Sequence, residues 1–142
     1  MIKWGFFDLG WTLVDETLVR RARWDTARDM LSTCGVHLST DELMSLSEQA
    51  ATTFAGSPFR AVLNGLNMTD EQRQSIISKA RYSHDQEVLY PGVPALLSEL
   101  SRSHRLGVIA NQSRGTADRL KAWGIHELFS LVSIQLQNCR KH

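Results

Sequence analysis

Residues 2–15 of the chain are Ile-Lys-Trp-Gly-Phe-Phe-Asp-Leu-Gly-Trp-Thr-Leu-Val-Asp. The segment from Met1 to Phe7 is largely apolar, which predicts a short buried strand. This strand leads directly into Asp8, and Gly10 indicates a tight loop immediately after it. An acidic side chain at the end of an apolar strand lies where open parallel sheets bind their ligands. Asp8 is therefore the first candidate functional residue.

After this strand the pattern becomes helical and stays helical to about residue 87. Ser39 or Thr40 could cap one helix, and Thr69 with Gln72 forms the spacing of a capping box at the start of another. The predicted helices of this block cover residues 17–34, 40–54, 58–66 and 69–82. Because no strand is predicted within residues 16–87, we expect this block to be an insert on the core.

The rest of the chain alternates between strand and helix. Apolar runs predict strands over residues 105–110 and 129–134, and helices are predicted over 94–103 and 116–123. Strands separated by helices indicate an α/β fold with a parallel sheet. The predicted organisation is a core of residues 1–15 and 88–142 with a helical insert of residues 16–87.

Composition narrows the class of protein. The chain has 142 residues, 42% hydrophobic and 22% charged, and a formal net charge of +1. This balance gives no electrostatic reason to expect nucleic acid or a membrane as a partner. The apolar runs are shorter than a membrane span, and the amino-terminal residues do not resemble a signal peptide. The chain has two cysteines, which is consistent with two free thiols in a reducing compartment. We therefore expect a cytoplasmic protein.

Two polar clusters follow predicted strands, Asp8–Thr12 after the first and Asn111–Ser113 after the second. If these strands are neighbours, both clusters lie at one edge of the sheet. A carboxylate there can attack a phosphoryl group, and the Thr12 hydroxyl can form a hydrogen bond with the loop or with a phosphate oxygen. The alternative is that Asp8 only caps a turn after a buried strand.

Residues 2–15 resemble the first motif of the haloacid dehalogenase-like hydrolase superfamily, an apolar strand followed by Asp-x-Asp-Gly-Thr-Leu-Val. Residues 106–112, Leu-Gly-Val-Ile-Ala-Asn-Gln, stand in the place of its second motif, and the block at 16–87 is similar to its helical cap. The resemblance covers residues 1 to about 133 in collinear order. It implies a Rossmann-like core with a helical cap inserted after the first strand.

The resemblance also implies a function, hydrolysis of a small phosphate ester through an aspartyl-phosphate. It assigns Asp8 as nucleophile and Mg²⁺ ligand, and Gly10 as a second Mg²⁺ ligand through its carbonyl. It places Ala110, Asn111 and Gln112, together with Thr12, around the phosphoryl group. A hard metal ion and fixed donors would neutralise phosphate charge while the carboxylate attacks.

The chain departs from the family pattern at three places. Gly10 stands where the family has the aspartate that acts as general acid and base. Ala110 lacks the hydroxyl of the second motif. Residues 134–142 match neither the third nor the fourth motif, which favours a carboxy-terminally truncated form with an incomplete core.

Two further hypotheses follow from these departures. The chain could be a non-catalytic relative that keeps a ligand pocket. It could also be an interaction module, for example a homo-oligomer formed through the exposed edge of the first strand.

Overall fold

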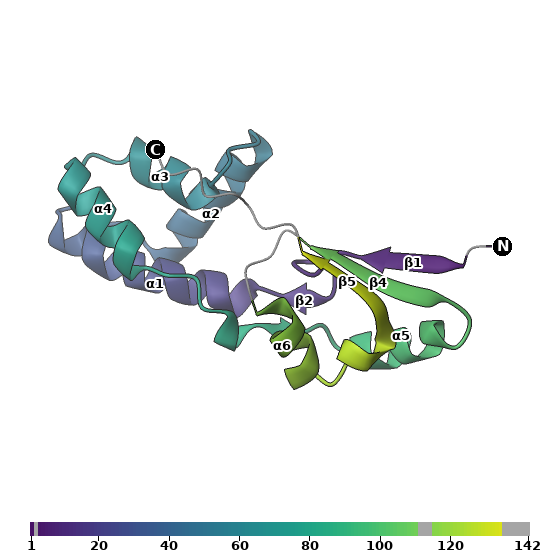
Figure 1. The fold of residues 1–142 in the computed structure, drawn as a ribbon. Helices are drawn as coiled ribbons and strands as arrows, with labels where there is room; N and C mark the ends of the chain where they lie inside the picture. Colours follow the sequence, from purple (N-terminus) through teal and green to yellow (C-terminus); the bar gives the residue numbers. More distant parts are fainter. Residues whose placement is uncertain (2, 111–114, 135–142) are drawn as a thin grey trace. The chain divides into compact units, whose positions relative to one another are not determined.

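The computed structural model describes residues 1, 3–110 and 115–134. The chain divides into two compact units. We call Met1–Glu16 with Glu87–His142 the sheet unit, and Thr17–Gln86 the helical unit. Each unit has its own cluster of buried apolar side chains. Figure 1 shows the strands gathered in the sheet unit, whereas the helical unit has no strand among its described residues.

The sheet unit is built on a parallel three-stranded sheet with the order β1-β4-β5. Its strands are β1 (Trp4–Phe7), β4 (Arg105–Ala110) and β5 (Phe129–Ile134). The predictions for 105–110 and 129–134 are confirmed to the residue, whereas the first strand is shorter than predicted. The α/β class with a parallel sheet is therefore correct, and β1 is an edge strand of the described sheet.

Two helices flank β4 in the chain, α5 (Val93–Ser101) before it and α6 (Thr116–Ala122) after it. Their apolar residues, such as Leu97 and Leu120, share one core cluster with Leu106 and Val108 of β4. Leu97, Leu120 and Val108 are fully buried. Because side chains alternate between the two faces of a strand, these helices cover only one face of the sheet.

The sheet unit also contains a short antiparallel ribbon, which the sequence did not predict. It pairs β2 (Val14–Asp15) with β3 (Val88–Leu89), in register Val14 with Leu89 and Asp15 with Val88. Two residues are too few to show an alternating pattern. Single 3₁₀ turns, η1 (His84–Gln86) and η2 (His126–Leu128), precede β3 and β5.

The helical unit contains α1 (Thr17–Thr33), α2 (Thr40–Thr52), α3 (Pro58–Gly65) and α4 (Asp70–Lys79). Ser39 and Thr69 cap α2 and α4, each in a complete capping box. At α2 the Ser39 backbone N–H and hydroxyl both donate to Glu42, which lowers the pKa of that carboxyl. Both caps therefore fix the helix starts that the sequence predicted.

Arg23 ties α1 to the rest of the helical unit. Its Nε donates to the Ala80 carbonyl at 2.9 Å, and its guanidinium lies 3.7 Å from the centre of the Phe59 ring. Burial and the neighbouring Arg60 lower the pKa of Arg23. Within the described residues, no helix is long and apolar enough to cross a membrane.

Candidate active site

Asp8 lies at the carboxyl end of β1, next to the carboxyl end of β4. The parallel register pairs Phe7 with Val108. Asp8 is one residue beyond that pair and Ala110 two residues beyond it, so both lie at the same edge of the sheet. The Asp8 side chain is exposed, and its Oδ1 accepts a hydrogen bond from the Leu9 N–H at 2.8 Å. This contact orients the carboxylate at the carboxyl edge of the sheet, which we call the rim.

The loop after Asp8 is a compact turn organised around one carbonyl. The Leu9 carbonyl accepts from the backbone N–H groups of Thr12, Leu13 and Val14 at 3.2, 2.9 and 3.0 Å. Leu9 and Leu13 are buried, at 1% and 3% exposure. The buried leucines and the shared carbonyl hold the turn in place. The turn therefore positions Asp8 and Gly10 at the rim.

Trp11, and not Gly10, carries the left-handed backbone of this turn. Its φ is 58°, whereas the positive φ angles among the described glycines fall at Gly35, Gly92, Gly115 and Gly124. Trp11 is half-exposed, at 49%. In the motif form Asp-x-Asp-Gly-Thr, position 11 of this chain is the glycine position. The tight loop expected at Gly10 is present, and its left-handed residue is the neighbouring Trp11.

The strain at Trp11 gives a stability prediction. A left-handed residue with a Cβ costs about 1–2 kcal/mol, so Trp11→Gly should be more stable than Trp11→Ala by about 1 kcal/mol. Both variants lack the indole, and their difference therefore isolates the backbone. Denaturant unfolding measures it.

The control for this comparison is Leu96, which is 52% exposed in α5. There Gly should be less stable than Ala by about 1 kcal/mol, because the backbone is helical. Equal stability of the two Trp11 variants would contradict the assigned strain.

The other predicted site residues differ in their exposure to solvent, and two of them are not described by the structure. Thr12 is exposed in the turn, close in sequence to Asp8. Ala110 is 1% exposed, so its methyl group belongs to the core and only its backbone could face a ligand. Asn111 and Gln112 lie outside the described residues.

A buried ion pair behind the rim was not predicted. Glu87 precedes β3 and Arg119 lies on α6; Glu87 Oε2 and Arg119 Nε are 3.2 Å apart. Their side chains are 2% and 14% exposed. The distance is that of an ion pair, although the contact lacks the alignment of a hydrogen bond. Arg119 Nη2 also donates to the Thr116 hydroxyl at 3.3 Å.

This pair links the β2–β3 ribbon, which follows the Asp8 turn, to the helix that follows β4. Two single charged residues far apart in the sequence give no local pattern, and only the three-dimensional contact reveals their partnership.

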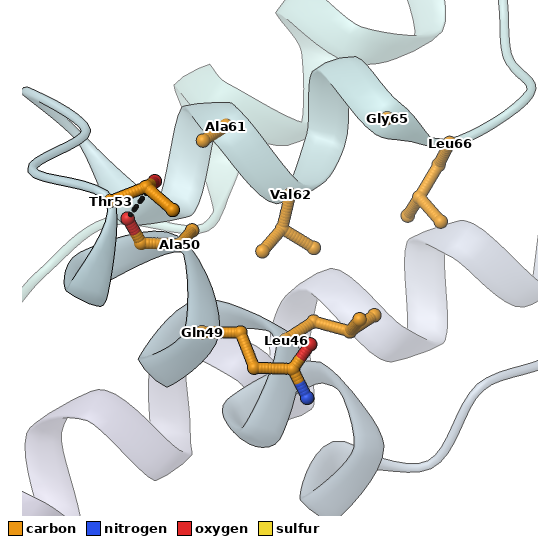
Figure 2. Close-up of a pocket in the computed structure, with 8 residues that line it drawn as sticks. All are labelled: Leu46, Gln49, Ala50, Thr53, Ala61, Val62, Gly65 and Leu66. Atoms are coloured by element: carbon orange, nitrogen blue, oxygen red, sulfur yellow. Dashed lines mark hydrogen bonds between the residues drawn. The ribbon is translucent and has the colours of Figure 1, made fainter.

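The helical unit has an apolar groove between α2 and α3, with a volume of about 400 Å³ (Figure 2). None of its lining side chains is charged, and the Thr53 hydroxyl donates to the Ala50 carbonyl at 2.8 Å. The groove is lined by Leu46, Gln49, Ala50, Thr53, Ala61, Val62, Gly65 and Leu66. It offers apolar contact and no acid, base or nucleophile of its own.

Comparison with solved structures identifies the fold. A haloacid dehalogenase-like hydrolase from Streptococcus pneumoniae has a TM-score of 0.65 at 22% identity, over 96% of this chain and 62% of that one. A protein from Clostridium difficile described as a phosphatase has a TM-score of 0.66 at 18% identity, over 94% and 61%. A protein from Bacillus subtilis described as a HAD-hydrolase bound to magnesium has 0.59 at 18%, over 94% and 63%.

No family model and no curated protein matches the chain. The chain spans less than two thirds of the length of each of these three solved structures. At sequence identities of 18–22%, the similarity to these structures supports a common fold and nothing more. Over nearly all of its length, the chain has the fold of the haloacid dehalogenase-like hydrolases.

Proposed function

We propose that the sheet unit hydrolyses a small phosphate ester, with Asp8 as the nucleophile. The observation that carries this proposal is the exposed Asp8 carboxylate at the carboxyl end of β1, beside the end of β4. Open parallel sheets bind ligands at this edge. The description of a structural neighbour as a phosphatase supports the same reaction class.

The hydrogen bond from the Leu9 N–H occupies Asp8 Oδ1, so Oδ2 is the oxygen that would attack. Attack forms an Oδ2–P bond and breaks the P–O bond of the ester, which releases an alkoxide that takes a proton. Water then attacks the aspartyl-phosphate and releases inorganic phosphate and the Asp8 carboxylate. The Thr12 hydroxyl is placed in this scheme as a donor to a phosphate oxygen.

Mg²⁺ is the ion that we assign to this site. The residues fit it in type: Asp8 supplies a carboxylate and Gly10 a backbone carbonyl, which are the hard oxygen donors that Mg²⁺ prefers. Within the described residues no cluster of three or more His, Cys, Asp and Glu side chains forms a metal site. Mg²⁺ commonly completes its shell with water and substrate phosphate. When bound, the ion would neutralise charge on the phosphoryl group.

Gly10 makes this reaction slow. The alkoxide leaving group needs a proton, and Gly10 has no side chain to give it. A positioned general acid contributes about 10²–10⁴-fold to such reactions. The proton therefore comes from solvent, and activated esters, whose leaving groups need no protonation, should be the better substrates.

The test is hydrolysis of p-nitrophenyl phosphate by the purified chain, with Mg²⁺ and with EDTA. We expect slow release of p-nitrophenol that requires Mg²⁺ and that falls to the protein-free rate in Asp8→Asn. The matched control is Asp118→Asn, an exposed carboxylate on α6, which should keep the parent rate. Activity that survives Asp8→Asn in a folded sample would refute the assignment.

A non-catalytic relative is the second candidate. Two observations favour it: Gly10 offers only its backbone, and the buried Ala110 methyl group replaces a hydroxyl. This candidate predicts no Mg²⁺-dependent turnover by the folded chain, so the same assay separates the two.

A further inference from the structure

The two faces of the sheet differ in what covers them. Leu106, Val108 and Ala110 of β4 belong to the core with α5 and α6, and Figure 1 shows both helices on the same side of the strands. The opposite face carries large apolar side chains that remain exposed within the described residues. They are Trp4 (37%), Phe6 (51%), Ile109 (51%) and Leu131 (46%), and we call them the bare face.

The bare face is continuous across all three strands. The rings of Trp4 and Phe6 stack, with centroids 5.5 Å apart and planes 3° from parallel. Phe6 lies over Gly107, where an added Cβ would come within 2.6 Å of the ring. Gly107 pairs in register with Leu131. The glycine therefore lets the aromatic ring lie flat on the middle strand, and a smooth apolar surface results.

Such a surface needs a partner. Parallel sheets are normally covered on both faces, and an exposed contiguous apolar patch marks an interaction site. We propose that the bare face packs against the bare face of a second copy of this chain, about a two-fold axis that reverses the strand direction. This proposal does not rest on the proposed enzymatic function.

Opposite charges at the two ends of the strands favour a second copy of this chain as the partner and determine its orientation. Arg105 pairs in register with Trp4, at the amino end of the strands, and lies 5.7 Å from the centre of that ring. Asp8 follows β1 at the other end, about 13 Å away along the strand. Both side chains are exposed. The reversed orientation brings each Arg105 to the end of the other copy where Asp8 lies, whereas a parallel stacking would place the two arginines together.

The area of the bare face indicates a small interface. A face about 14 Å wide and 17 Å long buries roughly 250–400 Å² per copy. This is about a third to a half of the ~800 Å² per partner found in stable complexes. An interface this small is typical of weak, transient complexes, so the dimer should be weak and reversible.

Sedimentation equilibrium of the intact chain up to about 200 µM tests the proposal. We expect a monomer–dimer equilibrium that Ile109→Glu and Leu131→Glu each abolish. The matched control is Leu96→Glu, an equally exposed leucine on α5, which should dimerise like the parent. Circular dichroism verifies that each variant is folded.

A charge exchange tests the orientation. Arg105→Glu should weaken the dimer at least about tenfold by placing two acids together, and Arg105→Glu with Asp8→Arg should restore it. A chain that stays monomeric at the highest concentration would overturn the proposal. Association that survives both Ile109→Glu and Leu131→Glu would also overturn it and point to another surface, such as the β1 edge.

Discussion

Replacing Gly10 with aspartate should raise phosphate-ester hydrolysis by about 10²–10⁴-fold, which is the usual contribution of a positioned general acid. The new carboxyl group would stand two residues after Asp8, in the same turn at the sheet edge. Gly10 is not among the described glycines with positive φ, so a side chain at this position does not meet the backbone strain of the left-handed region. The gain should be larger for alkyl phosphates than for p-nitrophenyl phosphate, since a poor leaving group depends more on protonation.

Two variants make this result specific. Gly10→Asn has nearly the same shape but cannot exchange a proton, so it should keep the parent rate. Gly10→Asp combined with Asp8→Asn should be inactive, because the acid assists a nucleophile that is no longer present. Equal gains from Asp and Asn would show that the side chain acts by filling space. No gain in a folded Gly10→Asp sample would contradict the placement of the missing acid at residue 10.

The sequence was sufficient for the main strands and helices of the fold. The runs at 105–110 and 129–134 are long enough for apolar periodicity to fix their ends, and the capping boxes at Ser39 and Thr69 fix two helix starts. The β2–β3 ribbon could not be predicted, because its strands have only two residues each and are separated in the sequence by the whole helical unit. Pairing at such separation depends on the closed fold and not on a local pattern.

The candidate site was predictable only in part. An acid that ends an apolar strand is visible in the sequence, and the parallel pairing of β1 with β4 confirms that the two predicted clusters follow neighbouring strands. The left-handed backbone at Trp11 was hidden, because tryptophan is an unusual residue for that conformation and Gly10 is its neighbour. The exposure of the bare face could not be predicted either, since an apolar strand has the same sequence whether one or both of its faces are covered.

Glu87→Ala should destabilise the sheet unit by about 3–5 kcal/mol, because it removes the carboxylate that lies 3.2 Å from the buried Arg119 Nε. The two side chains are 2% and 14% exposed, and the pair lies between the β2–β3 ribbon and α6. Guanidinium chloride unfolding, followed by tryptophan fluorescence and by circular dichroism, measures the loss. The control is Glu99→Ala, which breaks a surface pair with Arg102 that is 71% and 75% exposed; it should cost at most about 1 kcal/mol.

The double variant Glu87→Leu with Arg119→Met distinguishes loss of charge pairing from loss of packing. If the cost of Glu87→Ala is the isolated charge, removing both charges with apolar residues of similar volume should recover most of the stability. If the pair instead holds the ribbon and α6 in place, the double variant should be stable but should lose phosphate-ester hydrolysis, because the Asp8 turn continues into β2. A double variant as unstable as Glu87→Ala would contradict both readings and show that the cost comes from packing around Glu87 itself. This outcome matters for the site, because Asp8 is exposed at the rim and its position depends on the buried contacts behind it.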